Sequence, residues 1–202
     1  MRSKVTNKPT EKQLLPAGIS PSDPNIEFVG QANTKTVLWF QYGNPHRWET
    51  LPKNIYQALE ELFLTDDTAV KVLTNHYSEI ANDINRLTEI YTYYMYGDLD
   101  HNADVIDGVL QPCENFRETK DCLSLQFDFK YIDIEGVHLS QRDLKILDMC
   151  MDNMPDKLIA DHLGISQSTF DFHKKNLFKK FGCDSKVSIV VKGIKNHILC
   201  EN

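Results

Sequence analysis

Two short helical segments joined by a glycine turn, in the C-terminal third of the chain, constrain its fold more than any other feature. The first segment reads DKLIADHLG, in which Ile159, Ala160 and Leu163 are spaced to lie on one helical face. Gly164 permits the turn, and Ser166 is a good N-cap for the helix that follows. Two short helices with this connection are typical of a helix-turn-helix.

A further helix is predicted just upstream, in the segment LSQRDLKILDMC. Its apolar residues recur at helical spacing behind Ser140, which is a good N-cap. Asn153 can adopt the left-handed conformation that ends a helix, and Pro155 suits the first turn of the next one. The C-terminal region therefore reads as a series of helices.

The helix after Ser166 has two faces of different character. The face that we expect to pack against the core spans a sector of about 80° and holds Phe170, His173, Leu177 and Phe181. The opposite face holds Ser168, Asp171, Phe172, Lys175 and Lys179. A helix that is polar on one side and clamped on two helices by the other suits insertion into a groove of DNA. Lys174 and Lys180 flank the polar face, within reach of phosphates.

The segment LSQRDLKIL, followed by PDKLIADHLGISQSTFDFHKKNLFKKFGCDSKVSIV, resembles the DNA-binding domain of LuxR-type transcriptional regulators over about residues 137–198. The resemblance implies an all-α four-helix domain whose helix over residues 166–181 lies in the major groove of double-stranded DNA. It also implies a fourth helix, about Lys186–His197, that often supports dimerisation. The family's base-contacting positions fall on Asp171, Phe172 and Lys175 of this chain.

The helical wheel and the resemblance together give the candidate DNA-binding residues, which are Ser166, Ser168, Thr169, Asp171, Phe172, Lys174, Lys175, Lys179 and Lys180. The family keeps a histidine for packing at His173, so we expect a structural role there. The chain departs from the family at Leu158, where a glutamate is usual, and at Asp171, which is commonly basic. A carboxylate in the groove can accept a hydrogen bond from cytosine N4, which indicates an altered base preference, but it also fits weak DNA binding.

The N-terminal region is predicted to be an α+β domain with a long helix and a small antiparallel sheet. TKTVLWFQY, residues 34–42, is β-branched and aromatic, as in a buried strand. A helix that buries Tyr56, Leu59, Leu62 and Phe63 is expected to start near Pro52. LSLQFDFKY, residues 123–131, alternates apolar and polar residues, which predicts a half-buried strand paired with the first one.

An apolar stripe between these two strands predicts one long helix from about Asp66 to Tyr96. Its members are Val70, Leu73, Tyr77, Ile80, Ile84, Leu87, Tyr91 and Tyr94. The stripe fits either a helix of the domain core or a dimerising coiled coil. Because three of the eight members are tyrosines, packing in the core is the favoured interpretation.

Charge is distributed unevenly along the chain. Residues 1–135 hold 12 Lys/Arg and 21 Asp/Glu, a balance of −9, whereas residues 136–202 hold 10 and 8, a balance of +2, and the two sum to the net −7. Any nucleic-acid binding must therefore come from a local basic face in the C-terminal region. We divide the chain into a flexible arm over residues 1–13, an N-terminal domain over 14–135 and a DNA-binding domain over 136–202.

Other kinds of chemistry are not indicated. The sequence has no apolar run as long as a membrane span and no signal-peptide core, so we expect a cytoplasmic protein. It lacks the phosphate loop, nucleophile elbow and paired carboxylates of common enzymes, so we expect no catalysis, cofactor or metal. DLDHNADVIDGV, residues 98–109, lacks the Gly and Glu of a calcium loop. Cys113 and Cys122 make up only half of a tetrahedral zinc site.

The leading hypothesis is a sequence-specific, double-stranded DNA-binding regulator of transcription. The alternative is an interaction module, in which the helix-turn-helix is a scaffold and the acidic N-terminal domain binds a protein partner. The further partners considered are a second copy of the chain, through residues 186–198, and RNA polymerase.

Overall fold

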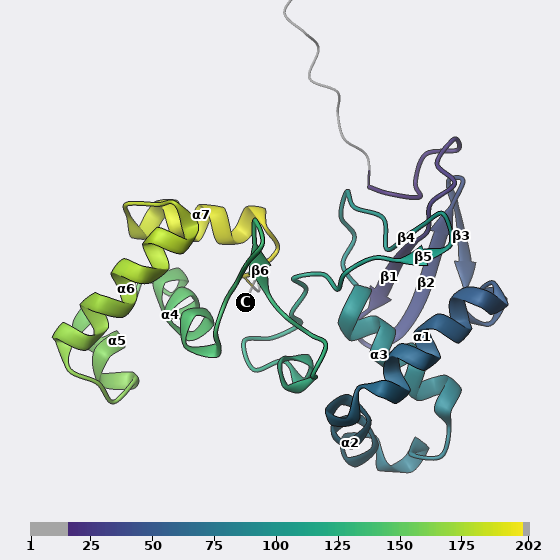
Figure 1. The fold of residues 1–202 in the computed structure, drawn as a ribbon, viewed down its shortest axis with the longest axis horizontal. Helices are drawn as coiled ribbons and strands as arrows, with labels where there is room; N and C mark the ends of the chain where they lie inside the picture. Colours follow the sequence, from purple (N-terminus) through teal and green to yellow (C-terminus); the bar gives the residue numbers. More distant parts are fainter. Residues whose placement is uncertain (1–15, 200–202) are drawn as a thin grey trace, which may run out of the picture.

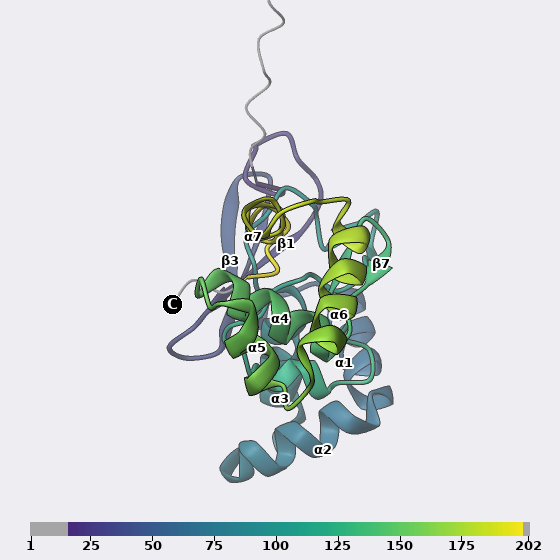
Figure 2. The ribbon, with the colours of Figure 1, turned by 90° about the vertical axis from the view of Figure 1, so that its left-hand side faces the viewer.

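The computed structural model describes residues 16–199, and the arm expected over residues 1–13 lies outside this range. Hydrophobic side chains of the described residues form two cores, one from Ile26 to Phe127 and one from Ile132 to Ile198. Figure 1 shows two bodies side by side, with the larger sheet in one and the C-terminal helices in the other. In Figure 2 the C-terminal helices lie nearest the viewer. The domain division expected after residue 135 stays a prediction.

A three-stranded antiparallel sheet forms one side of the first core. It consists of β1 (Glu27–Gln31), β2 (Thr36–Gln41) and β3 (Asn44–Arg47), with Phe28 opposite Trp39 and Phe40 opposite Pro45. Strand β2 confirms the strand predicted over residues 34–42. Its neighbours are β1 and β3, so its predicted pairing with residues 123–131 is wrong.

The helices of this body are α1 (Lys53–Thr65), α2 (Asp67–His76) and α3 (Ile84–Tyr96), and α3 packs on both β1 and β2. The prediction of one helix from Asp66 to Tyr96 is therefore wrong. Asp83 caps a new helix by accepting a hydrogen bond from the Arg86 amide at 3.0 Å, after the 3-10 turn η2 (Ser78–Ile80). An aspartate that caps the backbone stabilises a helix start, which the apolar stripe alone does not reveal.

Most of the stripe packs in the first core, as the favoured interpretation expects, but Ile84 is 38% exposed. Leu73, Leu87 and Tyr91 are fully buried and Tyr94 is nearly so, and all four belong to the first core. A side chain inside the core cannot form an intermolecular seam. The coiled-coil interpretation of the stripe is therefore wrong.

Residues 123–131 are not a strand. They form the 3-10 helix η3 (Leu123–Gln126) followed by irregular chain. The buried Asp66 carboxylate accepts hydrogen bonds from the Asp128 amide at 3.0 Å and from the Phe129 amide at 3.1 Å. The amides that a sheet would use are thus satisfied by a side chain, and the alternating pattern has a different cause.

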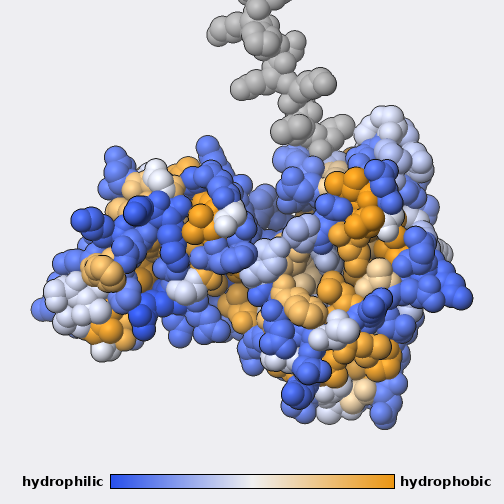
Figure 3. All heavy atoms as spheres, viewed as in Figure 1, coloured by the Kyte–Doolittle hydropathy of each residue, from blue (hydrophilic) through white to orange (hydrophobic). Residues whose placement is uncertain are grey.

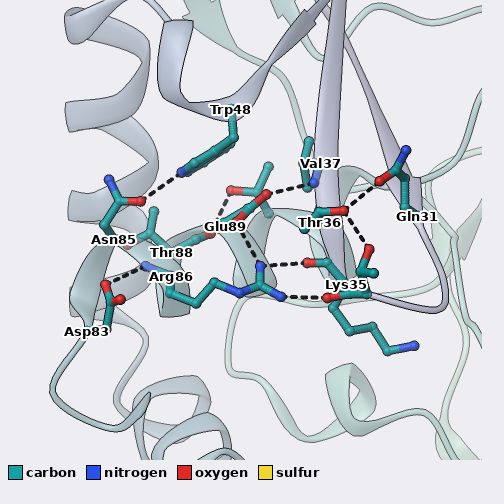
Figure 4. Close-up of polar contacts among 12 residues, drawn as sticks. Gln31, Lys35, Thr36, Val37, Trp48, Asp83, Asn85, Arg86, Thr88 and Glu89 are labelled. Atoms are coloured by element: carbon teal, nitrogen blue, oxygen red, sulfur yellow. Dashed lines mark hydrogen bonds and ion pairs between the residues drawn. The ribbon is translucent and has the colours of Figure 1, made fainter.

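A polar network around Arg86 joins α3 to the β1–β2 turn (Figure 4). The Arg86 guanidinium donates to the carbonyl oxygens of Lys35 at 3.0 Å and Thr34 at 2.5 Å, and it pairs with Glu89 at 2.7 Å. The other Glu89 oxygen accepts from the Val37 amide at 2.9 Å. Lys35 has a positive φ of 54°, and these hydrogen bonds hold the turn in that conformation.

The second body consists of a short hairpin and a run of helices, whose bounds are β6 (Asp133–Ile134), β7 (Val137–His138), α4 (Gln141–Met151), α5 (Asp156–His162), α6 (Gln167–Phe181) and α7 (Lys186–Lys195). The predicted helix boundaries around α4 are confirmed. Ser140 caps the start of α4 in a capping box with Asp143, and Asn153, after the end of α4, has a left-handed φ of 55°. These local signals fix where each helix starts and stops.

The two bodies are joined by buried polar contacts around Arg117, which lies in the segment after the short hairpin β4 (Val105–Ile106) and β5 (Val109–Leu110). The Arg117 side chain is fully buried and donates to both carboxylate oxygens of Asp148 on α4, at 3.1 and 2.8 Å. It also donates to the Ile198 carbonyl, after α7, at 2.9 and 2.6 Å. One side chain therefore links the first body to both ends of the second.

Replacing Arg117 tests this junction. Arg117→Ala is expected to lower the free energy of unfolding by about 3–5 kcal/mol, because it leaves the Asp148 carboxylate buried without its cation. The exposed pair Lys120–Asp152, at 2.7 Å, lies nearby and offers a matched control. Lys120→Ala should cost at most about 1 kcal/mol. Urea denaturation of the full chain measures both, and equal costs for the two variants would contradict the role given to Arg117.

Candidate nucleic-acid interface

The helix-turn-helix is built by α5 and α6, which pack closely on each other. Ile159, Ala160 and Phe170 are buried at this contact, as predicted from their spacing. Gly164 takes a φ of 63° in the turn, where a side chain would be strained. Ser166 caps α6 by accepting from the Thr169 amide at 3.2 Å. The start of α6 is thereby fixed relative to α5.

The opposite side of α6 is open to solvent. The residues predicted for this face are all exposed, and they are Ser168, Asp171, Phe172, Lys175 and Lys179. Phe172 is 62% exposed, so most of its apolar ring faces solvent. Gln167 donates to the Asp171 carboxylate at 3.0 Å, so this acid is oriented by a neighbour one helical turn away.

Two of the four candidate DNA-binding lysines are engaged within the domain. Lys174 pairs with Asp156 on α5, and Lys180 pairs with Asp143 on α4, both at 2.6 Å. Lys186 adds a second ion pair to Asp156. These pairs fasten α6 to the two preceding helices, so Lys174 and Lys180 hold the scaffold together whether or not they also reach DNA.

These ion pairs lower the pKa values of the two carboxylates, Asp156 and Asp143. Burial alone would raise the pKa of Asp156, but hydrogen bonds from Lys174 and Lys186 bring it below its ordinary value. At Asp143 burial is likewise outweighed by hydrogen bonds from Lys180 and Ser140, and the pKa is lowered. Both carboxylates are therefore ionised at neutral pH and hold their lysines.

His173 lies at the edge of the buried face and is only half-buried, whereas Phe170, Leu177 and Phe181 are fully buried. Its Nε2 lies 3.2 Å from the Arg142 guanidinium. Arg142 and Lys145 are exposed on α4 and lie beside the His173 side of α6. They extend the basic surface of α6 onto α4. Sequence reasoning missed them, although their spacing of three along α4 is the signal for a shared face.

The surface around α6 is polar, with a shallow pocket along the helix. In the view of Figure 3 the C-terminal helices are largely hydrophilic, with smaller hydrophobic areas between them. A shallow pocket of about 410 Å³ runs along α6 and is lined by Asp171, Lys174, Lys175, Phe178, Lys179 and Cys183. The arrangement offers cationic and aromatic side chains on one convex helix, which is the shape that a major groove admits.

Comparison with known families decides what this region is. Residues 137–192 match the family model described as GerE, bacterial regulatory proteins, luxR family. The C-terminal region is a LuxR-family helix-turn-helix domain. This domain indicates, at the level of the family, a DNA-binding transcriptional regulator. Neither a curated protein nor a solved structure matches the chain. No helix within residues 16–199 is long and apolar enough to cross a membrane.

The lysines of the LuxR-family domain divide into two groups that stability measurements can separate. Lys174→Ala and Lys180→Ala are expected to lower the free energy of unfolding by about 0.2–1 kcal/mol each, because each removes a partly exposed ion pair between helices. Lys175→Ala and Lys179→Ala should change it by less than about 0.5 kcal/mol. Thermal denaturation of the full chain measures all four, and a loss above about 0.5 kcal/mol at Lys175 or Lys179 would contradict the division.

Proposed function

We propose that this protein is a sequence-specific regulator of transcription that places α6 in the major groove of double-stranded DNA. The observation that carries the proposal is the exposed face of α6, opposite a fully buried face, in a domain that matches the LuxR family. Because the buried face fixes the rotation of the helix about its axis, the same side chains always point outward. A fixed outward face is what base recognition requires.

The exposed face divides into residues for bases and residues for phosphates. We assign Asp171, Phe172 and Lys175 to base edges, and the phenyl ring of Phe172 is suited to contact a thymine methyl group. The remaining candidates are assigned to the backbone, and these are Ser166, Ser168, Thr169, Lys174, Lys179 and Lys180. Lys174 and Lys180 would have to share their charge between a phosphate and a carboxylate. Lys179 is therefore the strongest backbone contact.

The salt dependence of binding tests the phosphate contacts. Log affinity for duplex DNA should fall linearly with log salt concentration, with a slope of about −0.9 for each phosphate neutralised. Lys179→Ala should make the slope shallower by about 0.9 per subunit and weaken all sequences alike. Lys53→Ala removes an exposed lysine from α1 and serves as the control, since it should leave both slope and affinity unchanged. A slope that is the same for wild type and Lys179→Ala would remove the assignment.

Assembly through α7 is the second part of the proposal. Val187, Val191 and Ile194 are 74%, 44% and 49% exposed and are spaced four and three apart, so they form an apolar stripe on the outside of α7. Two recognition helices about 34 Å apart, one turn of DNA, read more sequence than one. We infer that residues 186–198 pair two chains and so supply this second helix.

Charge introduced into the stripe tests the pairing. Val191→Asp should convert dimer to monomer, because it buries a carboxylate in the interface. Cooperative binding to two half-sites should be reduced, while binding to a single half-site is kept. Val109→Asp, at a residue 63% exposed in the β4–β5 hairpin, is the matched control. Sedimentation equilibrium compares the two with wild type. A wild-type chain that is monomeric alone and on a two-half-site duplex would contradict the dimer.

A further inference from the structure

Three acidic side chains from distant parts of the sequence converge in the first body. Glu27 begins β1, Asp104 precedes β4, and Glu114 follows β5. One carboxylate oxygen from each lies within 4.8 Å of those of the other two. Glu27 is fully buried, Asp104 is 2% exposed, and a pocket of about 650 Å³ lined by Asp104 and Glu114 leads to them.

Each carboxylate is held in place through one of its oxygens. Glu27 Oε1 accepts from the Asp100 amide at 3.0 Å, Asp104 Oδ2 from the Phe28 amide at 2.7 Å, and Glu114 Oε2 from the Asp98 amide at 2.9 Å. The other oxygens of the two glutamates, Glu27 Oε2 and Glu114 Oε1, are buried with no hydrogen-bond partner among the described residues. Backbone amides thus orient the group and leave buried oxygens unsatisfied.

The charge of the group is not balanced by its surroundings. Burial raises the pKa of Glu27 to about 8, and burial followed by the neighbouring carboxylates raises those of Asp104 and Glu114 as well. The ammonium that lowers the pKa of Glu114 is that of buried Lys130, which donates to the Tyr94 carbonyl at 2.8 Å. Ionisation of all three carboxyls at once is therefore unfavourable unless a cation is bound.

We propose that Glu27, Asp104 and Glu114 form a binding site for a divalent cation of the hard, oxygen-preferring class, such as Mn²⁺, Ca²⁺ or Mg²⁺. Carboxylate oxygens are the ligands that such ions prefer, and water from the pocket would complete their coordination. A bound divalent cation would favour the ionised form of all three carboxyls. The proposal does not depend on DNA binding.

The site is connected to the C-terminal domain. The Asp98 amide holds Glu114, and the Asp98 carboxylate lies 2.5 Å from His197 Nδ1. Asn115, next to Glu114, donates to the carbonyl oxygens of Asn196 and Asp133, both at 2.9 Å. A cation that fixes Glu114 therefore also stabilises the chain just after α7.

Binding of Mn²⁺ to the full chain, after removal of metals with EDTA, tests the site by electron paramagnetic resonance. We expect one saturable site per chain, with Ca²⁺ and Mg²⁺ as competitors. Glu27→Gln and Glu114→Gln each keep an oxygen acceptor and remove a charge, and each should weaken binding at least about tenfold. Asp107→Asn removes an exposed carboxylate of the β4–β5 turn and should bind as wild type does.

Several outcomes would overturn the proposal. These are absence of saturable Mn²⁺ binding by wild type, unchanged binding by both glutamine variants, and equal loss in Asp107→Asn. Circular dichroism of the metal-free variants shows whether they fold; if Glu114→Gln does not, Asp104→Asn replaces it with the same expectation. Saturation with Mn²⁺ should also slow hydrogen exchange at residues 193–199, and unchanged exchange there would contradict the connection to α7.

Discussion

The buried guanidinium of Arg117 is the contact on which the arrangement of the two bodies depends. It meets α4 at Asp148 and the segment after α7 at Ile198, and Asn115 makes further hydrogen bonds to Asp133 and Asn196. A buried charge is costly unless its partners are in place, so the geometry is tightly specified. Helix α6 therefore belongs to a domain in which both α4 and the segment just after α7 are tied to the N-terminal body.

Within the C-terminal domain the exposed face of α6 follows from what is buried beneath it. Phe170, Leu177 and Phe181 are fully enclosed, and ion pairs from Lys174 and Lys180 clamp the helix edges to α5 and α4. Phe172 and Lys175 are left pointing outward as a consequence. The proposed function thus rests on packing, because a helix with a fixed rotation would present the same few side chains to a groove of DNA.

The sequence predicted the parts of the molecule that depend on local signals. The caps at Ser140 and Ser166, the left-handed Asn153 and the two faces of α6 all follow from neighbours a few residues apart. It could not predict contacts between distant residues. The Asp66 carboxylate accepts hydrogen bonds from the amides of residues 128 and 129, where a strand was predicted. The carboxylates of Glu27 and Glu114 lie close together although 87 positions separate them in the sequence.

The most direct test of the central claim is selection of bound fragments from a randomised duplex library by the purified full chain. If the exposed face of α6 reads bases, wild type should enrich a short shared motif in two copies about one helical turn apart. Lys175→Ala, which leaves the buried face intact, should lose preference at one position of that motif while the rest is kept. Recovery of no shared sequence by wild type, from a folded protein that binds DNA, would contradict the account.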